Sequence, residues 1–277
     1  MFTEKDTLIR FLLPDAHARG VIIRGKALMK QAAEIHGMQG VPALMFGRTL
    51  LASIILLSVS KGGVRQVLQL DANVENTPIK RILAECCSGG VRGYVLWQDN
   101  PEPVLPDSDG ITAWLGRDML LSTVRDTGIG RPYVSTIKHD SDWLAEHVME
   151  YLKQSVQVQA DVILQDDLAI MIEAMPGCDD AHWFKAVEAM AKVSNQSIKK
   201  DDPEVILQIF DTLSCQIVGR DAFVYQCGCD KRDMQQVLAS ISVENLHDLA
   251  DEHGDVTLSC QYCKRTSKMN MQEGEQG

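Results

Sequence analysis

Four cysteines near the end of the chain form two close pairs, and their type and spacing indicate a metal site. Cys227 and Cys229 make a C-x-C pair, and Cys260 and Cys263 make a C-x-x-C pair after thirty intervening residues. Structural zinc prefers four tetrahedral ligands, and thiolates suit it well. Two short cysteine loops, brought together by an intervening segment that we expect to be helical, supply all four ligands. The sequence therefore predicts a four-cysteine site for Zn²⁺.

Two histidines between the cysteine pairs are alternative ligands. His247 and His253 both lie in the acidic stretch 244–255. A histidine in such a stretch is more often solvated than bound to metal. Nothing in the spacing requires either histidine to replace a thiolate, so four sulfurs remain the predicted ligand set.

The two pairs differ in how they would oxidise. A disulfide between Cys227 and Cys229 closes a tighter ring than one between Cys260 and Cys263. Strain makes a disulfide easier to reduce. A bridge within the first pair is therefore expected to be labile and reversible, as a redox sensor requires.

The other four cysteines need separate explanations. Cys86 and Cys87 are adjacent at the expected end of a strand, where we interpret them as small buried thiols. Cys178 follows the first large domain. Cys215 lies twelve residues before Cys227 and is a candidate for disulfide exchange with the site.

Length and composition indicate the number of domains and the cellular compartment, and so the redox state expected for these cysteines. A chain of 277 residues with 45% hydrophobic side chains is expected to form two domains. Residues 1–10 lack the order of a signal peptide, which predicts a cytoplasmic protein. In that reducing compartment, eight cysteines are not expected to form a disulfide framework. The longest apolar run, residues 49–59, is too short to span a bilayer and predicts a buried helix.

The distribution of charge bears on the partners. The net charge is −11, and residues 201–277 contribute −8 of it, from six Lys and Arg against fourteen Asp and Glu. Four thiolates bound to zinc add further negative charge to this region. Such a surface repels phosphate backbones, so the cysteine module is not expected to bind nucleic acid.

The elements before the cysteines predict an α+β domain over residues 1–177. Apolar periodicity indicates helices at 27–36, through the apolar run to about residue 60, and at 143–152. Alternating or β-branched runs bounded by turn residues indicate strands at 21–23, 64–71, 79–85, 91–98, 119–125, 156–164 and 168–175. Asp166 and Asp167 mark a hairpin turn. Short connections between strands predict a mainly antiparallel sheet.

Residues 178–226 are predicted to form a helical linker, and residues 227–277 a small zinc module. Pro203 suits the first turn of a helix, and Asp202 suits its cap. The apolar side chains that this linker must pack against a partner surface are Trp183, Phe184, Ile206, Ile209 and Phe210. We expect them to dock on the larger domain and to be candidates for binding other proteins if the linker is released.

Several segments together resemble the heat-shock protein 33 family of redox-regulated chaperones. The resemblance rests on the cysteine pairs with their neighbours and on residues 6–11, Arg19-Gly20, Arg92-Gly93-Tyr94 and 151–157. The chain departs from the family pattern at Val156, at residues 71–73 and at residues 264–268, which replace the usual aromatic residues. None of these departures removes a predicted zinc ligand.

The resemblance implies an ATP-independent holdase that is inactive when reduced and zinc-bound. It implies that oxidation releases the zinc and joins Cys227 to Cys229 and Cys260 to Cys263. The active protein would be a homodimer, assembled through the first domain, that binds unfolded or partially folded clients and neither nucleic acid nor membrane. The chain has no P-loop motif, and we expect no enzymatic activity.

Two other classes of protein remain open from the residues alone. A thiol-disulfide oxidoreductase would use the C-x-x-C pair as its redox centre, although that pair would normally begin a helix in a thioredoxin-like fold. A constitutive zinc ribbon that binds protein would use all four cysteines as a permanent brace.

Overall fold

The computed structural model describes residues 5–60, 62–99, 108–230, 236–237, 240–242, 245 and 248–270. The chain divides into two compact units, Met1–Tyr225 and Gln226–Gly277. The first unit contains a large sheet with helices on both faces, and the second contains the four clustered cysteines. The expected α+β class is confirmed.

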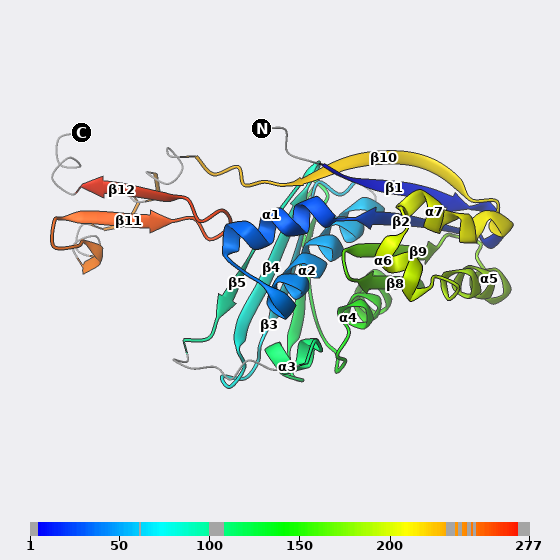
Figure 1. Ribbon diagram of the computed structural model, residues 1–277, viewed down its shortest axis with the longest axis horizontal. Helices are drawn as coiled ribbons and strands as arrows, with labels where there is room; N and C mark the ends of the chain where they lie inside the picture. The colour runs from blue at the N-terminus through cyan, green and yellow to red at the C-terminus, as the bar shows by residue number, and fades with distance from the viewer. Residues whose placement is uncertain are drawn as a thin grey trace. The chain divides into compact units, whose positions relative to one another are not determined.

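The first unit is built on a ten-stranded sheet with the order β7-β6-β3-β4-β5-β10-β1-β2-β9-β8 (Figure 1). Its strands are β1 (Asp6–Leu13), β2 (Ala18–Arg24), β3 (Arg65–Asp71), β4 (Ile79–Cys87), β5 (Gly90–Trp97), β6 (Leu120–Asp126), β7 (Tyr133–Lys138), β8 (Ala160–Gln165), β9 (Leu168–Ala174) and β10 (Gln216–Tyr225). All neighbours pair antiparallel except β10 and β5, which run parallel. β10 therefore joins two antiparallel halves into one sheet.

Helices α1 (Lys26–His36), α2 (Gly40–Val59), α3 (Ile111–Leu115) and α4 (Leu144–Tyr151) pack around one large apolar core, which we call the central cluster. The centre of α2 is fully buried there, with Phe46, Leu50 and Ile54 all 0% exposed. At twenty residues, α2 is long and apolar enough to cross a membrane by length and composition, but two thirds of its apolar window is buried within the protein. This burial is what a core helix requires.

Two glycines allow the close packing of this unit. A Cβ atom at Gly93 would lie 2.3 Å from the carbonyl oxygen of Leu83 and 2.8 Å from the ring of Phe46. A Cβ atom at Gly20 would lie 2.3 Å from the ring of Phe11. Only glycine lets the backbone approach its neighbours at these two positions.

A second apolar core, which we call the linker cluster, lies between β1, β2 and β9 and the helices that follow them. These are α5 (Asp180–Met190), α6 (Asn195–Lys200), α7 (Pro203–Leu207) and the 3₁₀ helix η3 (Gln208–Leu213). Phe11 of β1 stacks on Phe210 of η3 with ring centroids 5.5 Å apart. The helices of residues 180–213 are thus docked on the sheet, as the sequence predicted.

The second unit is much smaller. Its described strands are β11 (Asp255–Ser259) and β12 (Thr266–Asn270), which form an antiparallel hairpin. Val256 is buried, and Ile241, Ala250 and Leu258 pack partly buried against it. The described part of this unit therefore has a very small apolar core.

The structure corrects part of the expected linker. Residues 216–225 are strand β10 in the interior of the sheet, and they are not helical as predicted for 178–226. The reason is pairing with distant partners, because β10 takes its hydrogen bonds from β1 and β5. The contacts keep residues 178–225 in the first unit, so the chain forms two compact units, in agreement with the two domains expected from its length.

Smaller differences concern the ends of elements. The predicted strand 156–164 begins at Ala160, because Leu152–Val156 form a π-helical turn, η2, after α4. Pro203 begins α7 as predicted, but the side chain of Asp202 makes no capping hydrogen bond. A further short helix, η1 (Pro14–Ala16), connects β1 and β2.

Candidate metal centre

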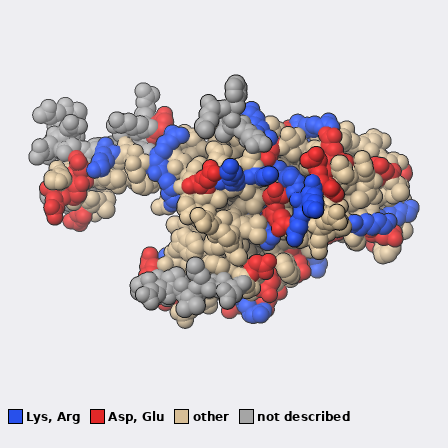
Figure 2. All heavy atoms as spheres, in the orientation of Figure 1, with Lys and Arg blue, Asp and Glu red and all other residues tan. Residues whose placement is uncertain are grey.

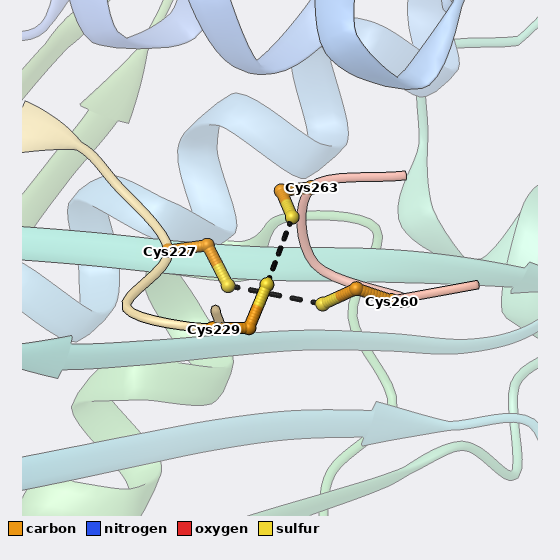
Figure 3. Close-up of side chains that lie close together, drawn as sticks. All are labelled: Cys227, Cys229, Cys260 and Cys263. Carbon is orange, nitrogen blue, oxygen red and sulfur yellow. Dashed lines mark hydrogen bonds between the residues drawn. The ribbon is translucent and has the colours of Figure 1, made fainter. Parts of the chain in front are cut away.

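Two segments of the second unit carry the four cysteines. Cys227 and Cys229 lie on the extended segment after β10, and Cys260 and Cys263 lie on the turn that connects β11 and β12. Figure 3 shows the four side chains pointing toward one another from these two segments. The structure thus brings together the four residues predicted from their spacing.

The sulfur positions fit a tetrahedral metal ion. The Sγ atoms of Cys227 and Cys260 are 3.8 Å apart, and those of Cys229 and Cys263 are 3.3 Å apart. All four sulfurs lie within 4.8 Å of one another. A Zn–S bond of about 2.3 Å gives a tetrahedron whose sulfur–sulfur edges are about 3.8 Å. The donor set and its spacing therefore suit zinc.

Hydrogen bonds shape the turn that holds the second pair. The amide N–H of Cys260 donates to the carbonyl oxygen of Arg265, and that of Lys264 donates to the carbonyl oxygen of Cys260, each at 2.8 Å. Lys264 adopts a left-handed conformation with φ of 57°. The guanidinium of Arg265 donates to the carbonyl oxygen of Cys229 at 3.1 Å, which links the turn to the first pair.

The same turn stabilises a thiolate at Cys260. Burial acts to raise the pKa of Cys260, but the backbone N–H groups of Cys263 and Tyr262 hydrogen-bond its sulfur and lower the pKa to about 7. Burial raises the pKa of Cys229 and Cys263, and the neighbouring sulfurs contribute to both shifts. The four thiols are therefore chemically unequal.

The cysteines outside the cluster are poor nucleophiles at neutral pH. Burial raises the pKa of Cys86 well above its usual value. Cys87 is exposed, so the expectation of a buried thiol is wrong at that position, and partial burial raises the pKa values of Cys87 and Cys178. Burial and the nearby carboxylate of Asp211 raise the pKa of Cys215 to about 11. A thiol that stays protonated reacts slowly with oxidants and disulfides. Disulfide exchange through Cys215 thus has a chemical obstacle.

Of the two alternative histidine ligands, His253 is not part of the cysteine cluster. His253 is exposed, and its amide N–H donates to the carboxylate of Asp251 at 2.9 Å. His247 lies outside the described residues. In the segment between the two pairs, which was expected to be helical, the described residues 236–237, 245 and 248–249 are helical, whereas residues 255–259 form strand β11. Among the residues that the structure describes, the four cysteines are the group placed to hold a metal ion.

The predicted linker residues have different surroundings. Phe210 and Ile206 are buried in the linker cluster, and Trp183 and Ile209 pack partly buried against it. Phe184 points to solvent with 67% of its surface exposed. Four of the five residues are thus covered in this state, and one is already exposed.

The fold and the site define a two-unit α+β protein with a large sheet in the first unit and, in the second, a cluster of four cysteines that could hold a metal ion. A model of the Hsp33 protein family matches residues 6–270, so the chain belongs to the Hsp33 family. The chain is 26% identical to the 33 kDa chaperonin of Geobacter sulfurreducens over 93% of its own length and 90% of that protein. It is also 26% identical to the 33 kDa chaperonin of Desulfotalea psychrophila, over 94% of this chain and 92% of that protein.

A solved structure has the same fold. The 33 kDa chaperonin (heat shock protein 33 homolog) of Thermotoga maritima matches with a TM-score of 0.80 and 20% identity, covering 97% of this chain and 96% of that one. An Hsp33-type chaperone is therefore the class of protein that family membership supports.

The position of the C-x-x-C pair argues against an oxidoreductase. Cys260 and Cys263 lie in a turn between two strands. Thioredoxin-like enzymes activate such a pair at the N-terminus of a helix. The same turn geometry suits a metal-binding loop.

Proposed function

We propose that this protein is a redox-regulated, ATP-independent holdase chaperone that binds Zn²⁺ through Cys227, Cys229, Cys260 and Cys263. The observation that carries the proposal is the four-sulfur cluster in a unit whose described part has a very small apolar core. Such a unit depends on its ligands for folding. In the reduced, zinc-bound form the protein is inactive, and oxidation activates it.

Zinc stabilises the fold of the second unit and keeps the four sulfurs as thiolates. Structural zinc contributes on the order of 10–16 kcal/mol of apparent folding free energy in small domains. The apolar core that the described residues of this unit form, Val256 and its three neighbours, is too small to replace that contribution. The second unit therefore unfolds when the thiolates are lost.

Peroxide is the oxidant class that fits this chemistry. One thiolate attacks the peroxide and becomes a sulfenic acid, with release of hydroxide. A second thiolate then attacks the sulfenic sulfur, so that a disulfide forms and a second hydroxide leaves. Each disulfide thus transfers two electrons to one peroxide. By family resemblance, the final bridges are Cys227–Cys229 and Cys260–Cys263.

This pairing has a structural consequence. In the reduced structure the sulfurs of Cys227 and Cys260 and those of Cys229 and Cys263 are in contact between the segments, and all four sulfurs lie within 4.8 Å of one another. The proposed disulfides lie within each segment. Bridges within each segment would remove the thiolates through which a shared zinc ion would link the two segments, which agrees with unfolding of the second unit.

Release of the linker helices then uncovers apolar surface for clients. Trp183, Ile206, Ile209 and Phe210 leave the linker cluster and, with Phe184, bind unfolded or partially folded proteins. The active form is a homodimer in the cytoplasm. It acts by binding alone, without catalysis, and its partners include neither nucleic acid nor membrane. The surface charge supports the nucleic-acid part, because both signs of charge gather over α1, α6 and α7 on the face shown in Figure 2.

The test compares aggregation and metal content in the same sample. Reduced, zinc-loaded protein and peroxide-treated protein are mixed with a thermally unfolding client, light scattering is recorded, and free zinc is measured with a chelating dye. We expect suppression only after oxidation, together with zinc release and reversal by a thiol reductant. Cys229→Ser should abolish this regulation, and Cys87→Ser, an exposed cysteine outside the cluster, should leave it intact.

The same experiment distinguishes the alternative. A protein that retains zinc after peroxide and suppresses aggregation equally in both states would be a constitutive zinc-braced binding protein. Absence of suppression in both states would contradict a holdase of either kind.

A further inference from the structure

Arg24, the last residue of β2, connects the sheet to the helices that cover the linker cluster. Its side chain is only 16% exposed. Its Nη2 atom donates to the carbonyl oxygens of Ile198 at 2.7 Å and Asp201 at 2.8 Å. Its Nη1 atom forms an ion pair with the carboxylate of Asp167, in the turn between β8 and β9. One largely buried guanidinium thus satisfies three acceptors from two parts of the chain.

The two carbonyl groups are at the C-terminal end of α6. Carbonyls there have no partner within the helix and carry the negative end of its dipole, so a cation stabilises them. α6 has only six residues, too few to be stable without tertiary contacts. Its side-chain anchor is Ile198, which is 3% exposed in the linker cluster. Because Asp201 leads directly into α7, Arg24 also holds the start of that helix.

Asp167 fixes the guanidinium independently of the linker. The carbonyl oxygen of Asp167 accepts a hydrogen bond from the amide of Gly25 at 2.8 Å, which ties the β8–β9 turn to the end of β2. Arg24 is therefore held in place before α6 docks. A preorganised donor loses less side-chain entropy when its partner binds.

Two other polar contacts join α6 and α7 to strands, and both are exposed. Gln165 donates to the side chain of Asn195 at 3.4 Å. Arg220 pairs with Glu204 at 2.9 Å, with side chains 52% and 60% exposed. Exposed ion pairs contribute little to stability, whereas a buried donor that loses its partners leaves unsatisfied groups. The two hydrogen bonds of Arg24 to Ile198 and Asp201 are thus expected to dominate polar attachment of these helices.

We propose that Arg24 is a positioning residue that holds α6 and the start of α7 on the sheet and so sets how readily the linker cluster opens. The consequence for activity rests on the proposed function, in which opening of this cluster exposes client-binding surface. Without Arg24, residues 195–213 open more often while zinc is still bound.

The first test measures hydrogen exchange by mass spectrometry on the full-length, reduced, zinc-loaded protein. Arg24→Met should raise the exchange rate of amides in residues 195–213 by about tenfold or more, because charged hydrogen bonds are lost. Amides of β3, β4 and β5 should be unchanged. Arg220→Met is the matched control and should change the rate in residues 195–213 by less than about threefold. Asp167→Asn, which weakens the ion pair and keeps the side-chain shape, should give an intermediate rate in the same residues.

The outcomes separate this proposal from the proposed function. Unchanged exchange in residues 195–213 for both Arg24→Met and Asp167→Asn would overturn the positioning role, as would an equal rise throughout the sheet. If Arg24→Met does not fold, Asp167→Asn decides the matter. The same samples are assayed for zinc and for suppression of client aggregation without oxidant, where partial suppression with full zinc content is expected. A third outcome is faster exchange in residues 195–213 of Arg24→Met while neither this variant nor the oxidised wild-type protein suppresses client aggregation. That outcome would support the positioning role of Arg24 and reject the holdase function.

Discussion

The two units of this protein reach a folded state by different means. The first unit buries two large apolar clusters on opposite faces of a ten-stranded sheet. The described part of the second unit buries Val256 among three partners and brings four cysteine sulfurs together. Burial of apolar surface stabilises the first unit under any redox condition, whereas in the function that we propose the second unit depends on the chemical state of its sulfurs. The comparison shows how one chain could combine a first unit that is stable in any redox state with a second unit that, in the proposed function, responds to oxidation.

The linker cluster occupies an intermediate position in this comparison. It belongs to the first unit, but its covering helices α6 and α7 are only six and five residues long. Short helices depend on tertiary contacts for their stability. A modest loss of attachment can therefore uncover this face while the central cluster remains closed.

Removal of zinc should have the largest effect, because it should unfold the second unit and leave the first unit folded. Chelation under reducing conditions should unfold the second unit, because it removes on the order of 10–16 kcal/mol of apparent folding free energy. The first unit should remain folded. Backbone NMR would show collapse of the signals of residues 255–270 and retention of those of β3, β4 and β5. A metal-free second unit with unchanged signals would show that its small core suffices, contrary to our account.

A large-to-small substitution in the central cluster should destabilise the first unit and leave the second unit unchanged. Phe46 is 0% exposed, and its ring lies 5.1 Å from that of His36 and 6.5 Å from that of Tyr225. Phe46→Ala should lower the free energy of unfolding of the first unit by about 3–5 kcal/mol. Zinc affinity should not change. Phe184→Ala is the matched control, and denaturant unfolding should show a change within about 0.5 kcal/mol because Phe184 is largely exposed.

A contact beside the cysteines should have a smaller effect confined to the second unit. Arg265→Ala removes the hydrogen bond from the guanidinium to the carbonyl oxygen of Cys229. Outer contacts of this kind typically change metal affinity by about 10–100-fold, and we expect the lower end because Arg265 is exposed. Competition with a zinc-chelating dye would measure it. Lys264→Ala, which removes a hydrogen bond from the ammonium group to the side chain of Gln261, should leave the affinity nearly unchanged. An equal loss of affinity for both variants would reject the role of Arg265.

The smallest expected effect is a pH dependence within the first unit. His147 is 0% exposed, its Nε2 lies 2.9 Å from the carbonyl oxygen of Ser141, and its buried Nδ1 has no hydrogen-bond partner among the described residues. Burial, as the largest cause, lowers the pKa of His147. The unfolded chain therefore binds the proton more tightly, so the unfolding free energy of the first unit should fall as the pH drops below about 6.5.

One group of this kind can change the free energy of unfolding by at most about 1.4 kcal/mol per pH unit. Denaturant unfolding between about pH 7.5 and 5.5, a range that spans the ordinary histidine pKa, would measure it. His147→Gln should flatten the curve, and His253→Gln, at an exposed position, should not. An unaltered slope in His147→Gln would assign the pH dependence to other groups.

Much of this architecture could be predicted from local patterns. Alternation and turn residues predicted a strand at 64–71, which the structure places at Arg65–Asp71, and the hairpin at Asp166 and Asp167 lies between β8 and β9. The spacing of the cysteines predicted the cluster, because four ligands on two short segments constrain each other strongly. Local signals sufficed wherever neighbouring residues determine the structure.

The sequence could not reveal what depends on distant partners. β10 was missed because its exposed polar residues look irregular until β1 and β5 pair with it, although alternation of Phe223 and Tyr225 into the core was a usable signal. The contacts of Arg24 with Ile198 and Asp201 join residues 174 and 177 positions apart. Which sulfurs approach one another likewise follows only from the folded second unit.

The most direct test of the central claim follows hydrogen exchange across both units during oxidation. Zinc-loaded, reduced protein and peroxide-treated protein are compared by mass spectrometry on the same peptides. Our account predicts loss of protection in residues 226–270 and in residues 180–213 after oxidation, with β3, β4 and β5 still protected and full recovery after reduction. Protection lost equally throughout the sheet, or unchanged in residues 226–270 when all four thiols are oxidised, would contradict it.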